Sequence, residues 1–351
     1  MDSATRHIGL DLGGTNIKWA VVEGAGDDWR TLDQGQVPTD ISGGERTVVA
    51  QLAELAGRVR DGAGGAVDSL GVAVPGLYIP ETGVVTFLTN VPGDWSATPV
   101  GEPVARATGL PTALINDARA FGLAELRFGA GRDVDSFIGL TLGTGVGGVF
   151  AIGNQVIQGY RGQAGELGHQ TIDPDGPWCG CGNRGCVEAY ARADQVARVC
   201  GTTTPQEAIE RARAGDERAR AGLAEIGRYL GIGIANAITV LTPDLVILGG
   251  GWAIAGELII EPIKAEMRRR VITTPVDRVD VVVAELGTWA GAIGAAVHGA
   301  EMAARASGAD PASDPDSAAG PDPAAGPDPA SGPDSAARPR RKISLTEGRS
   351  A

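Results

Sequence analysis

The stretch Ile8–Val22 reads IGLDLGGTNIKWAVV, which is two apolar runs joined by Gly13-Gly14-Thr15. Two apolar runs around a glycine pair are typical of a β-hairpin. Asp11 stands close to a tip whose backbone N–H groups and Thr15 hydroxyl are free to bind a ligand. Such a tip can cradle a phosphate while the carboxylate arranges a metal ion and its waters. A plain tight turn is the competing interpretation.

A second glycine-rich stretch follows the apolar run Ser136–Leu142. Its sequence, Gly143-Thr144-Gly145-Val146-Gly147-Gly148, formally matches the G-x-G-x-x-G pattern of dinucleotide-binding proteins, which requires a helix next. The following residues are apolar and end in a Gly-Asn turn, which predicts a second strand instead. We therefore predict another hairpin, and two hairpins of one kind indicate two related lobes that face one nucleotide.

Three of the four cysteines lie close together, at Cys179, Cys181 and Cys186, shortly after His169. Three thiolates and an imidazole form a complete tetrahedral set for Zn²⁺ and leave no open position, which predicts a structural ion. The spacing is too cramped for an obvious disulfide, and the interspersed glycines let the backbone fold around an ion. Three incidental thiols are the alternative.

Two carboxylates, Glu166 and Glu188, flank this cluster. Carboxylates are hard acceptors that do not belong in a thiolate-rich zinc shell. We therefore expect the metal to position them rather than to bind them.

Composition and charge exclude several classes of function. A chain of 351 residues with 43% apolar residues can bury a large core, which we expect in two lobes. The net charge of -13 and the aromatic content of 4% argue against nucleic acid and anionic membranes as partners. The first residues carry no apolar signal core, and no apolar run reaches membrane-spanning length. Together with the metal-like cysteine pattern, this favours a reducing, cytoplasmic location.

Strands and helices are predicted to alternate between these motifs. Helical spacing occurs at 45–60, 118–128, 205–220, 223–241, 261–270 and 290–304, and strands are expected at 70–74, 112–115, 245–248 and 279–284. The region 77–95 is rich in turn residues and is predicted to be a loop over a cleft.

The short strand at 112–115 delivers Asn116-Asp117 at its carboxyl end, where open α/β sheets place ligands. A helix N-cap is the competing interpretation, and on this spacing alone it is favoured.

We predict three parts of the chain. The first is an α/β lobe over 1–115, and the second is a larger α/β lobe over 116–305 that carries the zinc site and whose closing helix packs back on the first lobe. From about Ser307, Gly-Pro-Asp and Ala-Ser units recur, which predicts a disordered tail over 306–351. The basic cluster Arg338–Lys342 is expected to be a solvated charge run, with an acidic partner as the alternative.

In this order the motifs resemble those of the ROK family of bacterial repressors and sugar kinases. The resemblance runs from about residue 8 to about residue 304. It rests on Asp11–Thr15, Pro75-Gly76, Asn116–Ala118, Leu142–Gly148, Gly165–His169, the cysteine cluster through Glu188, and Leu248–Gly251. It implies an α/β, actin/hexokinase-like (ribonuclease H-like) fold with two lobes around a cleft. The activity implied is ATP-dependent phosphorylation of a hexose, first of all glucose to glucose 6-phosphate.

The resemblance also implies roles for individual residues. Asp117 resembles the catalytic base, and Asn116 resembles a ligand of the sugar hydroxyls. The remaining sugar contacts correspond to Glu166, His169 and Glu188, and the zinc ligands to His169, Cys179, Cys181 and Cys186. The phosphate loops correspond to Asp11, Gly13, Gly14, Thr15, Thr144 and Gly145, and the adenosine contacts to Gly250 and Gly251.

The cofactors implied are structural Zn²⁺ and the Mg²⁺ that accompanies ATP. A homodimer or a higher homo-oligomer is expected, because dimers are the usual unit of the family. Three positions depart from the family pattern: Arg119 and Asn16 replace a common Asn and Lys, and Val149 replaces a common Gly. Arg119 is expected to alter contacts at the edge of the sugar site.

Several alternatives stay open. Kinases for N-acetylmannosamine, N-acetylglucosamine and fructose use nearly the same residues, and the difference is expected within 77–95, including Thr89 and Asn90. A sugar-sensing regulator of the family would carry a helix-turn-helix segment before the kinase-like part, for which we expect no room. A non-catalytic sugar binder is disfavoured by the intact Asp11 and Asp117. Relatives that use polyphosphate lack the cysteine cluster, so ATP is the expected donor.

Overall fold

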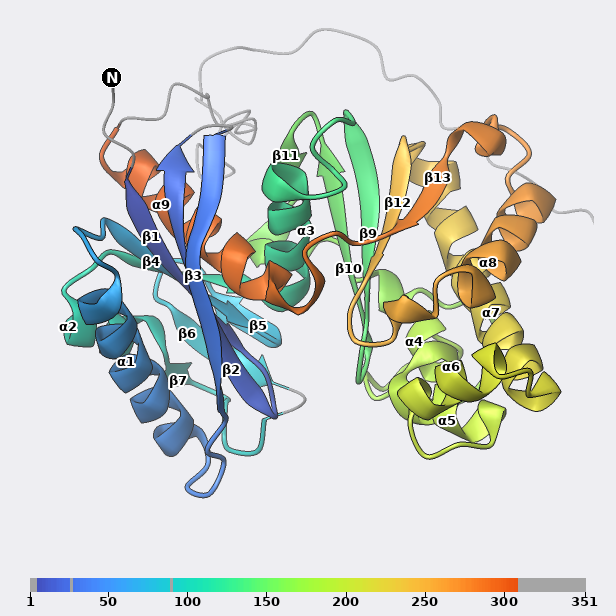
Figure 1. Cartoon of the computed structure of the whole chain (residues 1–351), viewed down its shortest axis with the longest axis horizontal. Helices are drawn as coiled ribbons and strands as arrows, with labels where there is room; N and C mark the ends of the chain where they lie inside the picture. The colour runs from blue at the N-terminus through green and yellow to red at the C-terminus, as the bar shows by residue number, and fades with distance from the viewer. Residues whose placement is uncertain (1–4, 26–27, 89–90, 309–351) are drawn as a thin grey trace, which may run out of the picture. The chain divides into compact units, whose positions relative to one another are not determined.

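The computed structural model describes residues 5–25, 28–88 and 91–308 (Figure 1). The predicted tail from residue 309 onward, with its basic cluster Arg338–Lys342, lies outside these residues, as do Thr89 and Asn90. None of the helices within the described ranges is long and apolar enough to cross a membrane.

A five-stranded sheet is built from the first part of the chain in the order β3-β2-β1-β4-β8. Its strands are β1 (Arg6–Leu12), β2 (Asn16–Ala25), β3 (Asp28–Pro38), β4 (Ser69–Val74) and β8 (Thr112–Asn116). The first three strands are antiparallel neighbours, whereas β1, β4 and β8 run parallel to one another. Helices α1 (Glu45–Gly62) and α2 (Gly101–Thr108) pack together and contact this sheet.

A second five-stranded sheet repeats this topology in the order β11-β10-β9-β12-β13. Its strands are β9 (Ser136–Leu142), β10 (Val146–Ile152), β11 (Gln155–Val156), β12 (Leu245–Gly249) and β13 (Asp280–Val283). Again three strands are antiparallel neighbours and three are parallel. The strand β10 after the second glycine tip confirms the predicted hairpin and excludes the dinucleotide-binding alternative.

The remaining helices surround the second sheet or connect the two sheets (Figure 1). They are α3 (Asp117–Phe128), α4 (Val187–Ala191), α5 (Ala193–Cys200), α6 (Pro205–Arg213), α7 (Glu217–Leu241), α8 (Glu257–Arg270) and α9 (Ala290–Ala306). Short 3₁₀ turns occur at Tyr160–Gly162, Leu167–His169, Ala253–Ala255, Val276–Arg278 and Gly287–Trp289.

Two predicted elements were wrong. The single helix expected at 205–220 is two helices, because Gly215 has a φ of 99° and the Asp216 side chain caps α7 by accepting from the Ala219 N–H. The loop expected at 77–95 contains β5 (Gly76–Ile79) and β6 (Val84–Leu88), which pair with each other. With β7 (Thr98–Pro99) they form a three-stranded antiparallel sheet.

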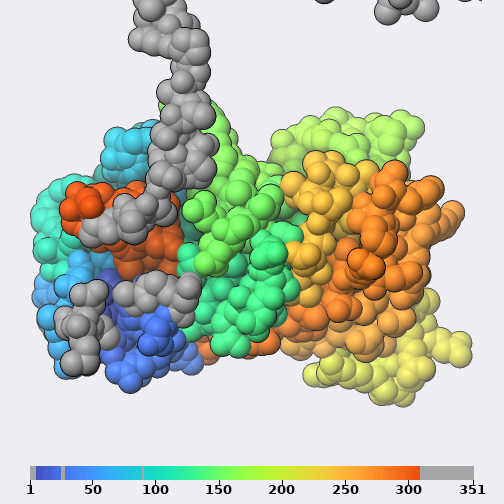
Figure 2. Space-filling model, turned by 90° about the horizontal axis from the view of Figure 1, so that it is seen from above, coloured from blue at the N-terminus to red at the C-terminus, as the bar shows by residue number. Residues whose placement is uncertain are grey.

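Helix α9 packs closely on the first sheet and on α3. Gly71 of β4 permits this approach, because a Cβ built on it would lie 1.8 Å from the carbonyl oxygen of Ala295. In Figure 2 the red residues of α9 lie beside the blue residues of the first sheet. Helix α9, the last among the described residues, therefore covers the strands that carry Asp11 and Asn116. The lobe boundaries at 115 and 305 stay predictions.

We expect Gly71→Ala to lower the thermal midpoint of unfolding by several degrees, because the new methyl group meets backbone atoms that cannot turn away. Overpacking of this kind costs about 1–3 kcal/mol. Gly57→Ala is the matched control. It lies in α1 with nothing within 4 Å of its added Cβ, so the same change should be neutral or stabilising. Equal midpoints for the two variants in differential scanning calorimetry would contradict the close packing.

Candidate active site

The parallel strands of the first sheet bring the predicted catalytic residues to one edge. In the register, Asp11 of β1 stands beside Ala73 of β4, and Val74 of β4 stands beside Asn116 of β8. The carboxyl ends of these strands therefore meet, and Asp117 follows directly on the last of them. The charge of Asp11 is close enough to raise the pKa of Asp117.

Asn116 and Asp117 open helix α3. Asn116 is the N-cap, and its Oδ1 accepts from the backbone N–H of Ala118 at 3.0 Å. The same N–H also lies 2.8 Å from Oδ1 of Asp117. The Asn116 Nδ2 donates to the carbonyl oxygen of Gly76 at 3.3 Å. The predicted N-cap is thus confirmed, and it leaves Asp117 in the first turn of the helix, where the helix dipole favours a negative charge.

The ionisation of Asp117 is strongly perturbed. Burial raises its pKa to about 7, and the nearby Asp11 carboxylate adds to this rise, while Arg119 opposes it. Burial also raises the pKa of Asp11, with Lys18 of the neighbouring strand acting in the other direction. A carboxylate that titrates near neutral pH is suited to accept a proton during a reaction.

The first hairpin tip is fixed by the end of β3. The Gly13 N–H donates to the carbonyl of Asn16 at 3.0 Å, and the Thr39 hydroxyl donates to the carbonyl of Gly13 at 2.7 Å. Gly14 is partly exposed and Thr15 is exposed. These contacts hold the tip in one conformation and leave the Thr15 side chain accessible to a ligand.

The second hairpin tip lies at the same sheet edge as the glycines after β12. Strands β9 and β12 are parallel, and Gly249 stands beside Thr141. Gly250 has a φ of 91°, and a Cβ on it would lie 2.4 Å from the Leu142 backbone nitrogen. The structure therefore brings Thr144 and Gly145 close to Gly250 and Gly251, as one nucleotide site would require.

The predicted metal ligands form one cluster. The ligand atoms of His169, Cys179, Cys181 and Cys186 all lie within 4.8 Å of one another. The Sγ atoms of Cys181 and Cys186 are 3.8 Å apart, and Nδ1 of His169 is 3.6 Å from Sγ of Cys179. Tetrahedral zinc with its usual bond lengths requires about 3.8 Å between two sulfurs and about 3.6 Å between sulfur and nitrogen. The cluster therefore fits a Zn²⁺ ion.

Glu188 connects this cluster to the second hairpin. Its Oε2 accepts from the Val146 N–H at 2.9 Å, and its Oε1 lies 3.5 Å from Sγ of Cys179. A Cβ at position 145 would lie 2.3 Å from the Glu188 carboxylate, so a larger residue there would displace this side chain. The sequence interpretation gave Glu188 a sugar contact and missed this link. In the structure, one of its oxygens is committed to the backbone of the hairpin.

Arg119 lies inside the group of predicted sugar residues rather than at its edge. Its guanidinium donates to Oδ1 of Asn116 at 2.8 Å and to Oε1 of Glu166 at 2.7 Å. Glu166 in turn places Oε2 3.9 Å from Nε2 of His169, the nitrogen that faces away from the cysteines. Asn116, Glu166 and His169 are thus linked in one polar chain.

Tyr78 of β5 is a buried residue near this chain that the sequence interpretation missed. Burial raises its pKa to about 12, and the positive charge of Arg119 acts against this rise. It lies in the region 77–95, which was predicted to be a loop, so its burial in a strand was not expected.

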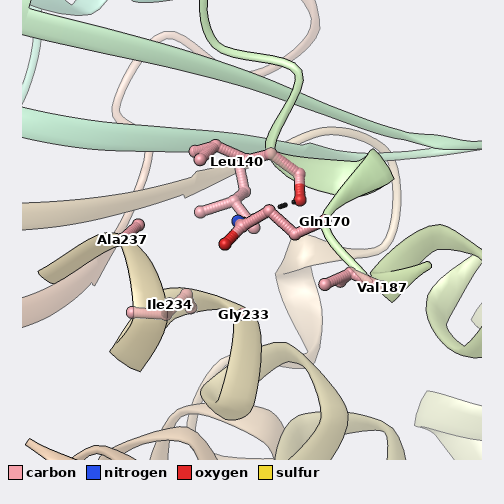
Figure 3. Close-up of a pocket in the computed structure, with 7 residues that line it drawn as sticks. Leu140, Gln170, Val187, Gly233, Ile234 and Ala237 are labelled. Carbon is pink, nitrogen blue, oxygen red and sulfur yellow. Dashed lines mark hydrogen bonds between the residues drawn. The ribbon is translucent and has the colours of Figure 1, made fainter. Parts of the chain in front are cut away.

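The segment that carries the cysteine cluster packs against α7. Figure 3 shows a narrow, mostly apolar crevice between the two, lined by Leu140, Leu167, Gln170, Val187, Gly233, Ile234 and Ala237. Gly233 allows close packing, since a Cβ on it would lie 2.5 Å from Cγ2 of Val187. None of the predicted sugar residues lines this crevice. It is therefore a packing interface between the cysteine segment and α7, and not the substrate pocket.

Known proteins resemble the chain over nearly all of its described length. Its sequence matches the ROK family over residues 7–300. A glucokinase of Thermotoga maritima is 34% identical over 308 residues, which is 82% of this chain and 95% of that protein. An N-acetylmannosamine kinase of Haemophilus influenzae is 32% identical over 257 residues, which is 71% of this chain and 82% of that protein.

Solved structures agree with these sequence matches. The ROK hexokinase of Thermus thermophilus has a TM-score of 0.73 and 37% identity, and the match covers 85% of this chain and 99% of that one. A ROK family glucokinase from Streptomyces griseus in complex with glucose and AMPPNP has a TM-score of 0.73 and 32% identity, covering 85% and 100%. The predicted actin/hexokinase-like fold is confirmed, and the chain belongs to the ROK family.

Proposed function

We propose that the protein phosphorylates a hexose with ATP, and that glucose, converted to glucose 6-phosphate, is its first substrate. The observation that carries this proposal is Asp117, a carboxyl group whose pKa is raised to about 7 by burial and which lies at the carboxyl ends of the parallel strands β1, β4 and β8. The glucokinase of Thermotoga maritima and the glucose- and AMPPNP-bound structure from Streptomyces griseus support this substrate and donor.

Asp117 is the proposed general base. Its carboxylate accepts the proton of the sugar hydroxymethyl group as that oxygen attacks the γ-phosphorus of ATP. The bond from the γ-phosphorus to the bridging oxygen breaks, and ADP leaves with that oxygen. Because such reactions depend mainly on positioning and on charge neutralisation, one base and two backbone tips suffice.

The two glycine tips are proposed to hold the phosphates. The sequence has no G-x-x-x-x-G-K-[ST] loop, so backbone N–H groups at Gly14, Thr144 and Gly145 would replace one. Gly13 would contribute by shaping the first tip, because its N–H already donates to the Asn16 carbonyl. Mg²⁺, bound with ATP, supplies positive charge to the transferring phosphoryl group. Asp11 would orient the waters of this ion, and Gly250 with Gly251 would contact the adenosine.

The metal cluster is proposed to hold a structural zinc ion. Four protein ligands leave no position for substrate, so the ion would act by fixing the chain between Glu166 and Glu188. His169 offers Nδ1 to the cysteine cluster and Nε2 to the side of Glu166. Zinc would thereby orient His169, a proposed sugar contact, and would take no part in phosphoryl transfer.

We also propose a homodimer and a cytoplasmic location. Closed dimers are the commonest assembly of soluble proteins, and the cysteine chemistry suits a reducing compartment. Light scattering of the purified chain tests the first proposal, and fractionation of the cells that make it tests the second.

Kinases for N-acetylated hexoses are the second candidate, supported by the relative from Haemophilus influenzae. A panel of glucose, mannose, fructose, N-acetylglucosamine and N-acetylmannosamine, each assayed by ADP release and ranked by kcat/KM, separates the two. Glucose should rank first. An N-acetylhexosamine at the top would replace glucose as the substrate and keep the mechanism.

We expect Asp117→Asn to lower kcat by about 10²–10⁴-fold, because the amide cannot accept the hydroxyl proton. Zinc content and the thermal midpoint should be unchanged. Asp133→Asn removes an exposed carboxylate outside the site and should retain full activity. Near-normal turnover by Asp117→Asn would overturn the proposed mechanism.

The rate should also depend on pH through Asp117. Its folded-state pKa is raised to about 7, so the base is progressively protonated, and activity is lost, as the pH falls through 7. We expect kcat/KM for glucose at subsaturating ATP to fall about tenfold per pH unit well below this value. A flat profile between about pH 8 and pH 5.5 is the contrary outcome.

Cys181→Ser tests the metal site. Cys181 is exposed, so its loss should cost little unless it holds an ion. We expect zinc to fall below one per chain by mass spectrometry, the thermal midpoint to drop, and the KM for glucose to rise. Cys200→Ala, which removes a buried thiol outside the cluster, should retain the zinc. Full zinc occupancy in Cys181→Ser would contradict the proposed ligand set.

A further inference from the structure

Arg119 is an unusual residue for its place in the fold. It stands in the first turn of α3, where the helix dipole disfavours a cation, and its side chain is only 2% exposed. Burying a guanidinium is costly unless it is paired and fully hydrogen-bonded. Its Nε is buried without a hydrogen-bond partner among the described residues, so this cost is only partly offset. The arginine therefore requires an explanation beyond stability.

The acceptors of Arg119 provide one. One terminal nitrogen donates to Oδ1 of Asn116 and the other to Oε1 of Glu166, and both acceptors belong to the proposed sugar site. We propose that Arg119 is a positioning residue for sugar recognition, which fixes the orientation of the Asn116 amide and the place of the Glu166 carboxylate. This inference rests on the proposed function, because it concerns how that site recognises its sugar.

The first consequence concerns Asn116. Its Oδ1 accepts from Arg119 Nη1 and from the Ala118 N–H, and the Arg119 N–H lies 3.4 Å away. Because a guanidinium has only donors, the amide oxygen must face it, and this oxygen has no lone pair left for a sugar. Nδ2 gives one hydrogen to the Gly76 carbonyl. Asn116 can therefore approach the sugar only as a donor, through its second N–H.

The second consequence concerns Glu166. Its side chain is 45% exposed and would sample several rotamers without a fixed partner. Arg119 holds one carboxylate oxygen at 2.7 Å and leaves Oε2 free, 3.9 Å from Nε2 of His169. A sugar hydroxyl bound beside Glu166 would therefore contact its Oε2, which is held in one position, and the adjacent Nε2 of His169.

The charges indicate the class of ligand. Glu166 neutralises Arg119, whose two terminal nitrogens are both engaged, so the arginine is not free to bind an anionic substituent. The other ionisable groups that face this site, Asp11, Asp117 and Glu188, are carboxyl groups and offer no positive charge to an anionic substituent. The site therefore favours an uncharged sugar over a uronic acid or a sugar phosphate.

Substitution of Arg119 tests this assignment. We expect Arg119→Asn to raise the KM for glucose about 10–100-fold, since loss of a charge-assisted hydrogen bond is worth roughly this factor. The KM for ATP and the zinc content should stay within about twofold of wild type. Arg119→Lys keeps the charge but cannot bridge both acceptors. Compared with Arg119→Asn, we expect its thermal midpoint to return toward the wild-type value more than its KM for glucose does.

Arg127→Asn is the matched control. Arg127 lies in the last turn of the same helix and also bridges an asparagine and a glutamate, at 2.7 Å from Asn154 Oδ1 and 3.1 Å from Glu301 Oε1. Its loss should lower the thermal midpoint without changing the KM for glucose. A KM that is unchanged in Arg119→Asn, or raised equally in Arg127→Asn, would overturn the assignment.

A double-mutant cycle adds an independent test. If Arg119 acts through Glu166, then Arg119→Asn in the Glu166→Gln background should raise the KM by less than about threefold. Fully additive effects of the two substitutions on the KM would contradict the inference that Arg119 acts through Glu166.

Failure of the proposed function gives a different result. If wild type phosphorylates no sugar of the panel, the proposed function is wrong, and the Arg119 variants are then compared by calorimetric titration with glucose. Equal affinities, or no binding at all, would overturn the positioning role as well. Loss of binding in Arg119→Asn alone would support it.

Discussion

Parallel pairing of β1, β4 and β8 is the constraint on which the proposed site depends. These strands run in one direction, so Asp11, the Gly76 carbonyl and Asn116 must emerge at the same edge although they are far apart in sequence. The pairing needs both faces of the sheet covered. Helix α9 covers one face. It approaches β4 so closely that a side chain at Gly71 would collide with the helix backbone. The position of the proposed base thus depends on the packing of α9 as well as on strand β8.

The second sheet repeats this arrangement, and Glu188 connects it to the metal cluster. One carboxylate oxygen holds the Val146 N–H just after the second glycine tip, and the other lies beside Cys179. The cysteine cluster and the proposed nucleotide tip therefore share a single side chain. A displacement of the cysteine segment would therefore move the second glycine hairpin as well, so rigidity of the cluster would stabilise the conformation of the hairpin.

Local motifs made much of this structure predictable, and distant contacts did not. The glycine tips, the cysteine cluster and Asn116-Asp117 were recognisable because each is encoded within a few residues. Strand β3 was not expected, because its residues are mostly exposed and polar and it owes its conformation to pairing with β2. The strands between 77 and 95 were missed because they are short and are interrupted by a bulge near Leu77. The contact from Arg119 to Glu166 spans 47 positions, and only the folded chain brings these side chains together.

The placement of Arg119 also explains how one site can contain two carboxylates with different tasks. Glu166 takes the hydrogen bond of the guanidinium, while burial, with Asp11 nearby, raises the pKa of Asp117 to about 7. Had the arginine paired with Asp117 instead, the pKa of that carboxyl would fall and it would become a poor proton acceptor. Environments that differ in this way give two carboxyl groups of one site separate roles, one in recognition and one in proton transfer. The direction in which Arg119 points thus assigns recognition to Glu166 and proton transfer to Asp117.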